Sequence, residues 1–345
     1  MNSFGRLFKV TIFGESHGES VGVNIDGCPA GLPLTVEDFL VDIERRKGGT
    51  QKGTTPRKED DLPIFKSGLF NNKTTGAPIT IIFENKNTRS GDYEKLRDFP
   101  RPSHADFVAH DKFGGYEDYR GGGHFSGRLT VCLVAVGVIA KKLLQHEKGT
   151  TVAANILEIG GEKDLEKGLQ KAIDAKDSIG GIVECRVAGL PAGLGEPFFE
   201  SAESLISHAA FSIPAVRGIE FGTGFAAARM FGVEHNDAII DTNGKTRTNH
   251  AGGIVGGITN GNELVYRIAI KPTASTPKEQ DTLNWKTGEV ETFSVKGRHD
   301  LCIALRVPVV LEAVTAMVLV DLMLMEQKIY RLVTPTLPGS QSVEE

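Results

Sequence analysis

The chain has 345 residues, of which 40% are hydrophobic and 24% are charged, a composition typical of a folded globular protein. Its net charge of −5 argues against a chain that coats nucleic acid, because such chains gather many cations against phosphates. The four cysteines are too widely spaced for a zinc ribbon or a secreted disulfide framework, which favours reduced thiols in the cytoplasm.

Helical and strand-like periodicities follow one another along the chain without strict alternation. In chain order they predict strands at 8–13 and 21–25, a helix at 36–46 capped by Thr35, a strand at 79–83, a helix at 128–145, a strand at 152–159, a helix at 164–175, a strand at 182–187, a helix at 202–211, a strand at 265–270 and a helix at 308–330. This order favours an α+β fold over a doubly wound parallel sheet. We expect one domain over residues 1–333 and a flexible tail over 334–345.

The apolar stretch at 307–325 is about as long as a membrane span. Glu312 and Asp321 interrupt it, and Pro308 stands where a helix would begin. The first fourteen residues contain no apolar block of the length that a secretory signal needs. The sequence therefore predicts a buried core helix, no membrane partner and a cytoplasmic location.

Two segments between these elements are more typical of functional loops than of regular secondary structure. Residues 84–127 show hardly any periodicity and contain three of the nine histidines, and structureless connections of this length are uncommon unless functional. Residues 241–261 are rich in glycine and asparagine, which let a backbone turn and approach a ligand closely. Both segments are predicted to be loops that build a site.

A cluster of cations lies at the end of the first predicted helix. Six of the fourteen residues from 45 to 58 are basic and none is acidic. Arginine's planar fork matches carboxylate and phosphate groups, so the cluster indicates a site for a polyanion. The competing interpretation is a solvated charge run balanced by Glu59, Asp60 and Asp61. The basic residues are Arg45, Arg46, Lys47, Lys52, Arg57 and Lys58.

Histidines stand in three turn-like segments. His17 follows the first strand in the sequence GESHG, where an imidazole could donate a proton near neutral pH. His104 and Asp106 are spaced as H-x-D, which is compatible with part of an iron-binding facial triad. His124 follows three glycines, whose N–H groups ahead of a helix suit an anion. For His17 the alternative is a hydrogen-bonding histidine of the surface or core, and for the triple glycine it is a plain structural turn.

Two later segments add hydroxyls and cations. Residues 271–275 read KPTAS directly after a strand, and residues 297–300 read GRHD ahead of the long C-terminal helix. Such groups suit a phosphate or a flavin, although each segment taken alone could be a cap or an ion pair.

Together these segments resemble the chorismate synthase family, from residue 4 to about residue 324. The resemblance rests on the order of FGESHG, RPSHAD, YRGGG, TNHAGGIVGGITNG, KPTAS and GRHD. It implies that family's β-α-β sandwich, in which central helices lie between antiparallel sheets. It also implies a lyase reaction, the anti-1,4-elimination of phosphate from 5-enolpyruvylshikimate 3-phosphate to give chorismate, the last common step of the shikimate pathway to aromatic amino acids.

The same resemblance implies roles for individual residues. His17 would act near the leaving phosphate, His104 would protonate or polarise the reduced flavin, and Asp300 would be linked to the flavin N5. The substrate's anionic groups would be bound by Ser16, Arg46, Arg101 and Arg128. The FMN site would be lined by His124, Phe125, Ser126, Gly256, Lys271, Pro272, Thr273, Ala274, Ser275 and Arg298, and no metal is expected. Many relatives read RSSAR where this chain reads HFSGR at 124–128.

Cofactors and partners are implied in the same way. The family uses reduced FMN without consuming it, and either NADPH or a separate flavin reductase would supply the electrons. A homotetramer is expected, with no nucleic-acid partner. Two other interpretations stay open from the residues alone: a non-haem iron oxygenase that uses His104 and Asp106, and a phosphate-sensing or flavin-storage module.

Overall fold

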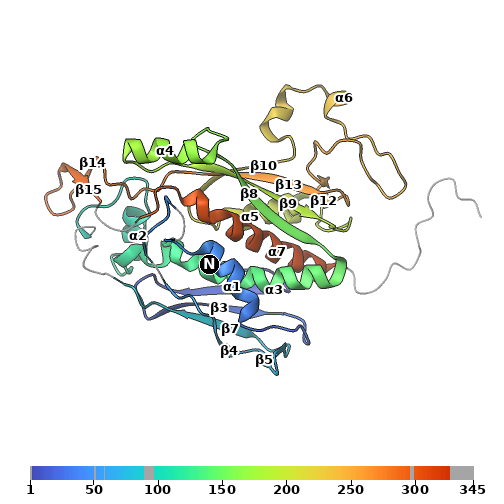
Figure 1. Ribbon diagram of the computed structural model, residues 1–345, viewed down its shortest axis with the longest axis horizontal. Coiled ribbons are helices and arrows are strands. Elements are labelled where there is room, and N and C mark those ends of the chain that lie inside the picture. The colour runs from blue at the N-terminus through green and yellow to red at the C-terminus, as the bar shows by residue number, and fades with distance from the viewer. Residues whose placement is uncertain (1, 50–51, 58, 89–96, 296–298, 327–345) are drawn as a thin grey trace, which may run out of the picture.

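Helices lie between two antiparallel sheets in the computed structural model, which describes residues 2–49, 52–57, 59–88, 97–295 and 299–326 (Figure 1). The first sheet has the strand order β1-β2-β3-β7-β4 and the second has the order β10-β13-β9-β8. The predicted α+β sandwich with central helices is therefore confirmed.

The first sheet owes its buried face to alternating apolar residues. In β7 the alternate residues Ile79, Ile81 and Phe83 are fully buried, as expected where one face of a sheet covers a core. Its strands are β1 (Ser3–Phe4), β2 (Lys9–Gly14), β3 (Ser20–Asp26), β4 (Ile64–Ser67) and β7 (Ile79–Glu84). The second sheet consists of β8 (Thr151–Ile159), β9 (Gly181–Ala188), β10 (Val216–Phe221) and β13 (Leu264–Ile270).

The central layer is built around two long apolar helices, α3 (Thr130–Lys148) and α7 (Val307–Met325). A Cβ added at Gly137 of α3 would lie 2.3 Å from the Cβ of Ala313, so glycine permits the close approach of α7. Two shorter helices, α1 (Glu37–Arg46) and α5 (Ala202–Ala210), complete the layer. The helical segment Ile303–Met325 is long and apolar enough to span a membrane, but 83% of its most apolar window is buried inside the protein. The prediction of a core helix is confirmed.

Both carboxylates that interrupt α7 are buried and satisfied. Asp321 accepts hydrogen bonds from the backbone N–H groups of residues 6, 7 and 8, at 2.8–3.1 Å. Glu312 accepts from Arg45 at 2.7 Å and from the backbone N–H of Ala154 at 3.0 Å. A buried charge is tolerated when it is paired in this way, so these residues join the central helix to both sheets.

The remaining elements lie outside the sandwich (Figure 1). Helix α4 (Leu165–Ala175) covers the outer face of the second sheet, and α6 (Gly232–His235) belongs to an arm formed by residues 222–261. At the opposite end lie α2 (Asp106–Phe113) and the hairpin β14 (Glu279–Leu283) with β15 (Val290–Ser294). Two further hairpins pair β5 (Leu69–Phe70) with β6 (Lys73–Thr74), and β11 (Ile254–Val255) with β12 (Ile258–Thr259).

Several local predictions are wrong. Thr35 does not cap α1, whose N-cap is Val36 without a side-chain hydrogen bond. Helix α2 lies in a segment predicted to be a loop. Only Ala109 of α2 is buried, so the helix has no apolar stripe for a periodicity search to detect. The predicted end of the last helix at Tyr330 and the predicted tail lie outside the described residues.

Candidate active site

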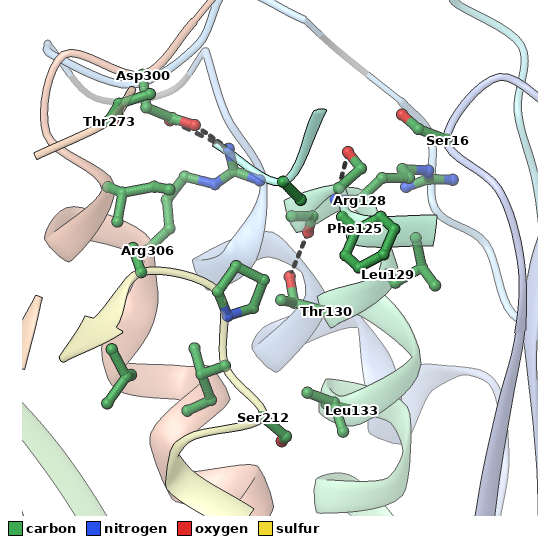
Figure 2. Close-up of a pocket in the computed structure, with 18 of the residues that line it drawn as sticks. Ser16, Phe125, Arg128, Leu129, Thr130, Leu133, Ser212, Thr273, Asp300 and Arg306 are labelled. Atoms are coloured by element: carbon green, nitrogen blue, oxygen red, sulfur yellow. Dashed lines mark hydrogen bonds and ion pairs between the residues drawn. The ribbon is translucent and has the colours of Figure 1, made fainter. Parts of the chain in front are cut away.

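A cavity of about 710 Å³ opens at the end of the sandwich, within the size range of small-molecule sites. Its wall comes from segments far apart in sequence, around residues 46–61, 101–105, 121–130, 208–217, 271–275 and 299–306. The part of it in Figure 2 lies between the start of α3 and the segment that leads into α7. Most of the residues predicted from the motifs therefore meet at one place.

Six arginines border this cavity, and five of them are each paired with a carboxylate. The pairing keeps guanidinium groups in fixed orientations, because arginine presents its donors in a rigid plane. The predicted polyanion site is supported by this arrangement, and the alternative of a solvated charge run is wrong because Asp61 is fully buried. The five paired arginines are Arg46, Arg57, Arg101, Arg128 and Arg306, and the sixth is Arg217.

The predicted cation cluster divides between two places. Arg46, Lys47 and Arg57 border the cavity. Arg45 turns away and pairs with Glu312, while the Lys52 Nζ donates to Gln170 at 3.1 Å on the surface. Lys58 lies outside the described residues. The cations of this cluster therefore do not all serve one site.

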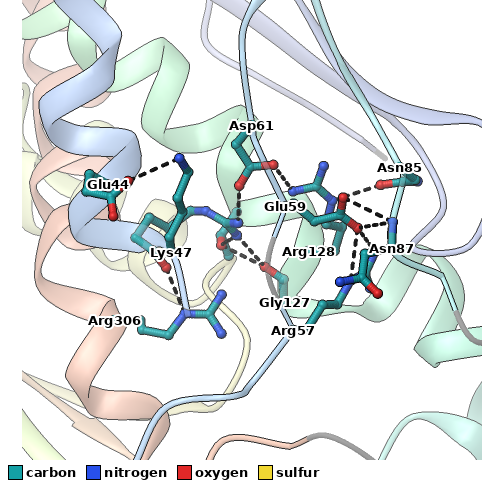
Figure 3. Close-up of polar contacts among 12 residues, drawn as sticks. Glu44, Lys47, Arg57, Glu59, Asp61, Asn85, Asn87, Gly127, Arg128 and Arg306 are labelled. Atoms are coloured by element: carbon teal, nitrogen blue, oxygen red, sulfur yellow. Dashed lines mark hydrogen bonds and ion pairs between the residues drawn. The ribbon is translucent and has the colours of Figure 1, made fainter. Parts of the chain in front are cut away.

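Asp61 pairs with both Arg46 and Arg128, two of the residues predicted to bind substrate, and Figure 3 shows its contact with Arg128. Its Oδ2 accepts from Arg46 Nη2 at 2.8 Å, and its Oδ1 accepts from Arg128 Nη1. Burial by itself would raise the pKa of Asp61, but the two guanidinium groups hold that pKa below its ordinary value. Two cations with one buried carboxylate leave an excess positive charge at this wall.

Arg57 forms a second braced group, next to Ser16. Its Nη1 donates to the Ser16 Oγ at 3.1 Å, and its Nη2 donates to Glu59 at 2.8 Å. Glu59 also accepts from the backbone N–H groups of residues 86 and 87. Arg57 is therefore fixed beside a serine that the sequence predicted as a substrate ligand.

The group of Arg101, His104 and Asp106 fixes a histidine ring. Asp106 Oδ1 lies 2.6 Å from His104 Nδ1, and Asp106 Oδ2 accepts from Arg101 Nε at 2.7 Å. Arg101 Nη2 also lies 3.1 Å from Nδ1, but the shorter contact is to a carboxylate that can only accept, so we assign the proton to Nδ1. Burial lowers the pKa of His104 below 6.5, outweighing the opposite effect of Asp106. The ring is therefore neutral at pH 7, with Nε2 as its acceptor.

His17 lies just behind the cavity wall. The described residues that line the cavity include Ser16 and Gly121 but not His17, whose residue is 8% exposed. Gly121 has a φ of +61°, and a Cβ there would lie 2.5 Å from the His17 Cδ2 and 3.0 Å from the Ser16 Oγ. The next residue, Gly122, would place a Cβ 3.5 Å from the His104 Cε1. Consecutive glycines thus contact both predicted catalytic histidines.

This position changes the interpretation of the triple glycine. Residues 121–123 all have positive φ and form a left-handed turn between the two histidine rings. A 3-10 helix (Gly127–Leu129) that runs directly into α3 begins four residues after Gly123, and the Gly122 N–H donates to the Tyr119 carbonyl, so this N–H group is not presented at the start of the helix. Their role is close packing, which only a residue without a side chain permits.

The residues predicted to contact flavin border the cavity on two sides. His124, Phe125 and Ser126 line it, with His124 Nδ1 2.8 Å from the carbonyl oxygen of Gly14. Opposite them, residues 271–275 line it, with Lys271 Nζ donating to the Ser103 carbonyl at 2.9 Å. Ser275 Oγ accepts from Arg101 Nη1 at 2.9 Å, so this segment also helps to position an arginine.

Asp300 lies at the cavity beside an arginine that the sequence analysis did not select (Figure 2). Arg306 Nη1 donates to both oxygens of Asp300, at 2.9 and 3.1 Å, and Arg306 Nε donates to the Arg46 carbonyl at 2.8 Å. The backbone N–H of Thr55 donates to Asp300 at 2.9 Å. These contacts join the segment before α7 to the end of α1.

One predicted flavin contact is not at this cavity, and a second cannot be placed. Gly256 lies in the turn between β11 and β12 and is not among the described lining residues. Arg298 lies outside the described residues.

Four site residues were missed as individual ligands: Arg57, Glu59, Asp61 and Arg306. The spacing of the first three could have indicated a shared site, because residues two apart in an extended chain point to the same side of that chain. Arg306 carried none, because it is a single cation ahead of an apolar helix.

The geometry does not favour an iron site. Both oxygens of Asp106 are engaged by Arg101 and His104. Within the described ranges, no group of three histidine, cysteine, aspartate or glutamate side chains is arranged to hold a metal ion.

Comparison with known proteins gives a consistent result. The sequence model of a family described as chorismate synthase matches residues 8–324. A chorismate synthase from Chitinophaga pinensis is 75% identical over 328 residues, which span 95% of this chain and 98% of that protein. One from Dehalococcoides mccartyi is 44% identical, over 94% of this chain and 96% of that protein. A solved structure described as the crystal structure of chorismate synthase matches with a TM-score of 0.71 and 25% identity, over 93% of each chain.

Proposed function

The chain belongs to the chorismate synthase family, and we propose that the arginine-lined cavity is where it eliminates phosphate from 5-enolpyruvylshikimate 3-phosphate. The family's anti-1,4-elimination yields chorismate, the last common step of the shikimate pathway to aromatic amino acids. The chain is accordingly an enzyme of the carbon–oxygen lyase class. This finding overturns the iron oxygenase and the phosphate-sensing or flavin-storage interpretations.

One observation carries the assignment of the site: five oriented arginines around one cavity in a chain of negative net charge. The substrate carries a phosphate and two carboxylates, which need several cations when they leave water. Arg46 and Arg128 share a single carboxylate, so their charge is not fully compensated by the protein. We assign Ser16, Arg46, Arg101 and Arg128 to the substrate, and the structure adds Arg57 and Arg306 as candidates.

The family needs reduced flavin, and we propose FMN at the wall formed by residues 124–126 and 271–275. Thr273 supports a ligand here, because its buried Oγ1 has no hydrogen-bond partner among the described residues. When bound, reduced flavin supplies electron density that helps the allylic C–O bond break, and it is regenerated. Arg298 is retained as a proposed contact.

The protein's part in the reaction is to orient charge and move protons. We assign His104, held by Asp106 with its Nε2 as acceptor, to polarise the flavin edge. Asp300, positioned by Arg306 and by the Thr55 N–H, is assigned to the flavin N5. His17 is assigned to protonate the leaving phosphate, a role that requires the glycine turn at 121–123 to shift, because Gly121 packs against its ring.

We propose a homotetramer on the basis of the arm at residues 222–261. Large apolar side chains of this arm are exposed, which marks an interaction surface. The assignment of Gly256 to the FMN site is kept only for an assembly in which a second copy brings its turn to the cavity. The exposed side chains include Phe225, Phe231, Val233, Ile239 and Val255.

The other proposals concern the cellular location, the source of electrons for the flavin and the domain organisation. We propose a cytoplasmic enzyme whose flavin is reduced by NADPH or by a separate flavin reductase. A single domain over residues 1–333 is supported by one hydrophobic core that includes residues from Phe8 to Leu322.

An anaerobic assay tests the function. With chemically reduced FMN and the enolpyruvyl substrate, we expect inorganic phosphate and the diene absorbance of chorismate to appear together at equal rates. Oxidised FMN under air is the negative control. NADPH as the sole reductant then distinguishes self-reduction from dependence on a reductase. Absence of phosphate release with reduced FMN contradicts the proposal.

A further inference from the structure

Asp61 combines a strained backbone with a fully buried charge. Its φ is +51°, in the left-handed region that few non-glycine residues adopt, although aspartate and asparagine tolerate it best. Its side chain is 0% exposed. Residues held in such conformations persist only when their surroundings require them, and they gather at functional sites. The conformation of Asp61 therefore needs an explanation beyond a turn.

The contacts of its two partners provide one. Arg46 also donates to the Thr130 Oγ1 at 3.2 Å and to a backbone carbonyl, and Arg128 also donates to the Asn85 Oδ1 at 2.8 Å and to a backbone carbonyl. These bonds use about three of the five donors of each guanidinium. The donors that remain include the buried Nε of Arg46, which has no partner among the described residues.

Repulsion would separate the two arginines without Asp61. Burial lowers the pKa of Arg46 to about 10, and the charges of Arg306 and Arg128 act in the same direction, while Asp61 opposes them. One carboxylate with an oxygen on each arginine holds two like charges side by side at a cavity wall. Such a pair is suited to a planar or tetrahedral anion.

We propose that Asp61 is a positioning residue for the elimination: it fixes the spacing and orientation of Arg46 and Arg128, so that their remaining donors converge on one anionic group of the substrate. The inference rests on the proposed function, in which these arginines bind substrate. Asp61 itself acts only through them.

The direction in which one substitution changes substrate affinity distinguishes a positioning role of Asp61 from simple charge balance. Asp61→Asn keeps the shape of the side chain and suits the left-handed backbone, but it makes the wall more positive by one charge. If Asp61 only reduced the positive charge of the wall, the variant would bind an anionic substrate more tightly. If Asp61 positions the arginines, the variant binds the substrate more weakly despite the added positive charge.

The experiment compares Asp61→Asn with Asp60→Asn in the anaerobic assay with reduced FMN. Asp60 is exposed and its substitution changes the net charge equally. We expect Asp61→Asn to raise KM for the enolpyruvyl substrate at least about tenfold, with a smaller fall in kcat, while FMN affinity and Asp60→Asn match the wild type. A substrate KM equal to or below the wild-type value overturns the inference.

A second comparison applies if Asp61→Asn does not fold. The double variant Asp61→Asn/Arg128→Gln removes one charge of each sign and avoids an uncompensated buried cation. If Asp61 also positions Arg46, the double variant has a substrate KM several times that of Arg128→Gln alone. Equal values contradict the inference. Wild-type enzyme that releases no phosphate contradicts the proposed function instead.

Discussion

Arg45 and Arg46 are adjacent at the end of α1 and belong to two different ion clusters. Arg45 joins Asp42, Lys141 and Glu312 between α1, α3 and α7, where two cations meet two carboxylates. Arg46 joins Arg128 and Asp61 at the cavity, where two cations meet one carboxylate.

The difference separates a structural cluster from a binding cluster. Glu312 accepts hydrogen bonds from Arg45, Lys141 and the Ala154 N–H, so the first cluster is balanced in charge. The second cluster keeps an excess positive charge and one donor, the Arg46 Nε, without a partner in the described part of the chain, and an anionic ligand can balance that charge. Charge balance at a buried site is therefore informative about its role.

Separate substitution of Arg45 and Arg46 is the strongest test of the difference between the two clusters. We expect Arg46→Met to lower kcat/KM about 1,000-fold, because a desolvated anion loses a charged hydrogen-bonding partner worth about 4 kcal/mol. Arg45→Met should stay within about twofold of the wild type per folded molecule. Steady-state phosphate release measures both variants, and equal losses would contradict the division into two clusters.

The Arg101 cluster extends the comparison to a histidine. Asp106→Asn keeps the shape of the side chain but removes the carboxylate that orients the His104 ring, and we expect kcat to fall about 100-fold. Asp111→Asn is the matched control, because Asp111 is an exposed residue of the same helix. A normal kcat for Asp106→Asn in the reduced-FMN assay would remove His104 from the proposed mechanism.

The glycine turn at 121–123 allows a steric test of the proposed role of His17. A methyl group at position 121 would collide with the His17 ring, so Gly121→Ala should lower kcat at least about tenfold. Gly114→Ala introduces nearly the same backbone strain, with φ of +62° against +61°, but the nearest atom is 3.9 Å away. We expect a lower kcat for Gly121→Ala than for Gly114→Ala among folded molecules, and equal kcat values would count against the role of His17.

Arg45→Met tests the structural cluster by stability. Loss of Arg45 leaves Glu312 buried with Lys141 and one backbone donor, and we expect about 1–2 kcal/mol of lost unfolding free energy. The side chain of Arg45 is 41% exposed, so solvent reduces the effect below that of a fully buried pair. Urea unfolding measures it, with Lys142→Met as the control, because the carboxylate that this variant leaves behind, Asp38, is more exposed than Glu312. Equal stability of the two variants would contradict the distinction.

The smallest expected effect is a pH dependence of stability from His104. Its folded pKa lies below the unfolded value near 6.5, so the unfolded chain binds more protons below that pH. Stability should therefore be lost as the pH falls below about 6.5, by less than about 1 kcal/mol from this residue. Unfolding at pH 7.5 and 5.5 should show a smaller pH effect in His104→Gln, and an equal or larger effect would reverse the assigned sign.

Local patterns predicted the long elements well and the exposed ones poorly. The core strands β3 and β7 and the helices α3 and α7 were found because their burial produces continuous or alternating apolar residues. Helix α2 and the short hairpins bury little, so their sequences carry no such period. The motif order predicted which side chains would meet, and the cavity brings together all of the predicted site residues that the structure describes except His17 and Gly256.

By itself the sequence determined the fold class, the family resemblance and the chemical nature of the site, because periodicity and motif order are written along the chain. Only the tertiary structure decided that Arg45 supports the core while Arg46 faces the cavity. Adjacent residues of a helix point in different directions, and their partners Glu312 and Asp61 come from other segments. The same long-range packing turned Asp61 from one charge in an acidic run into the residue that holds two arginines together.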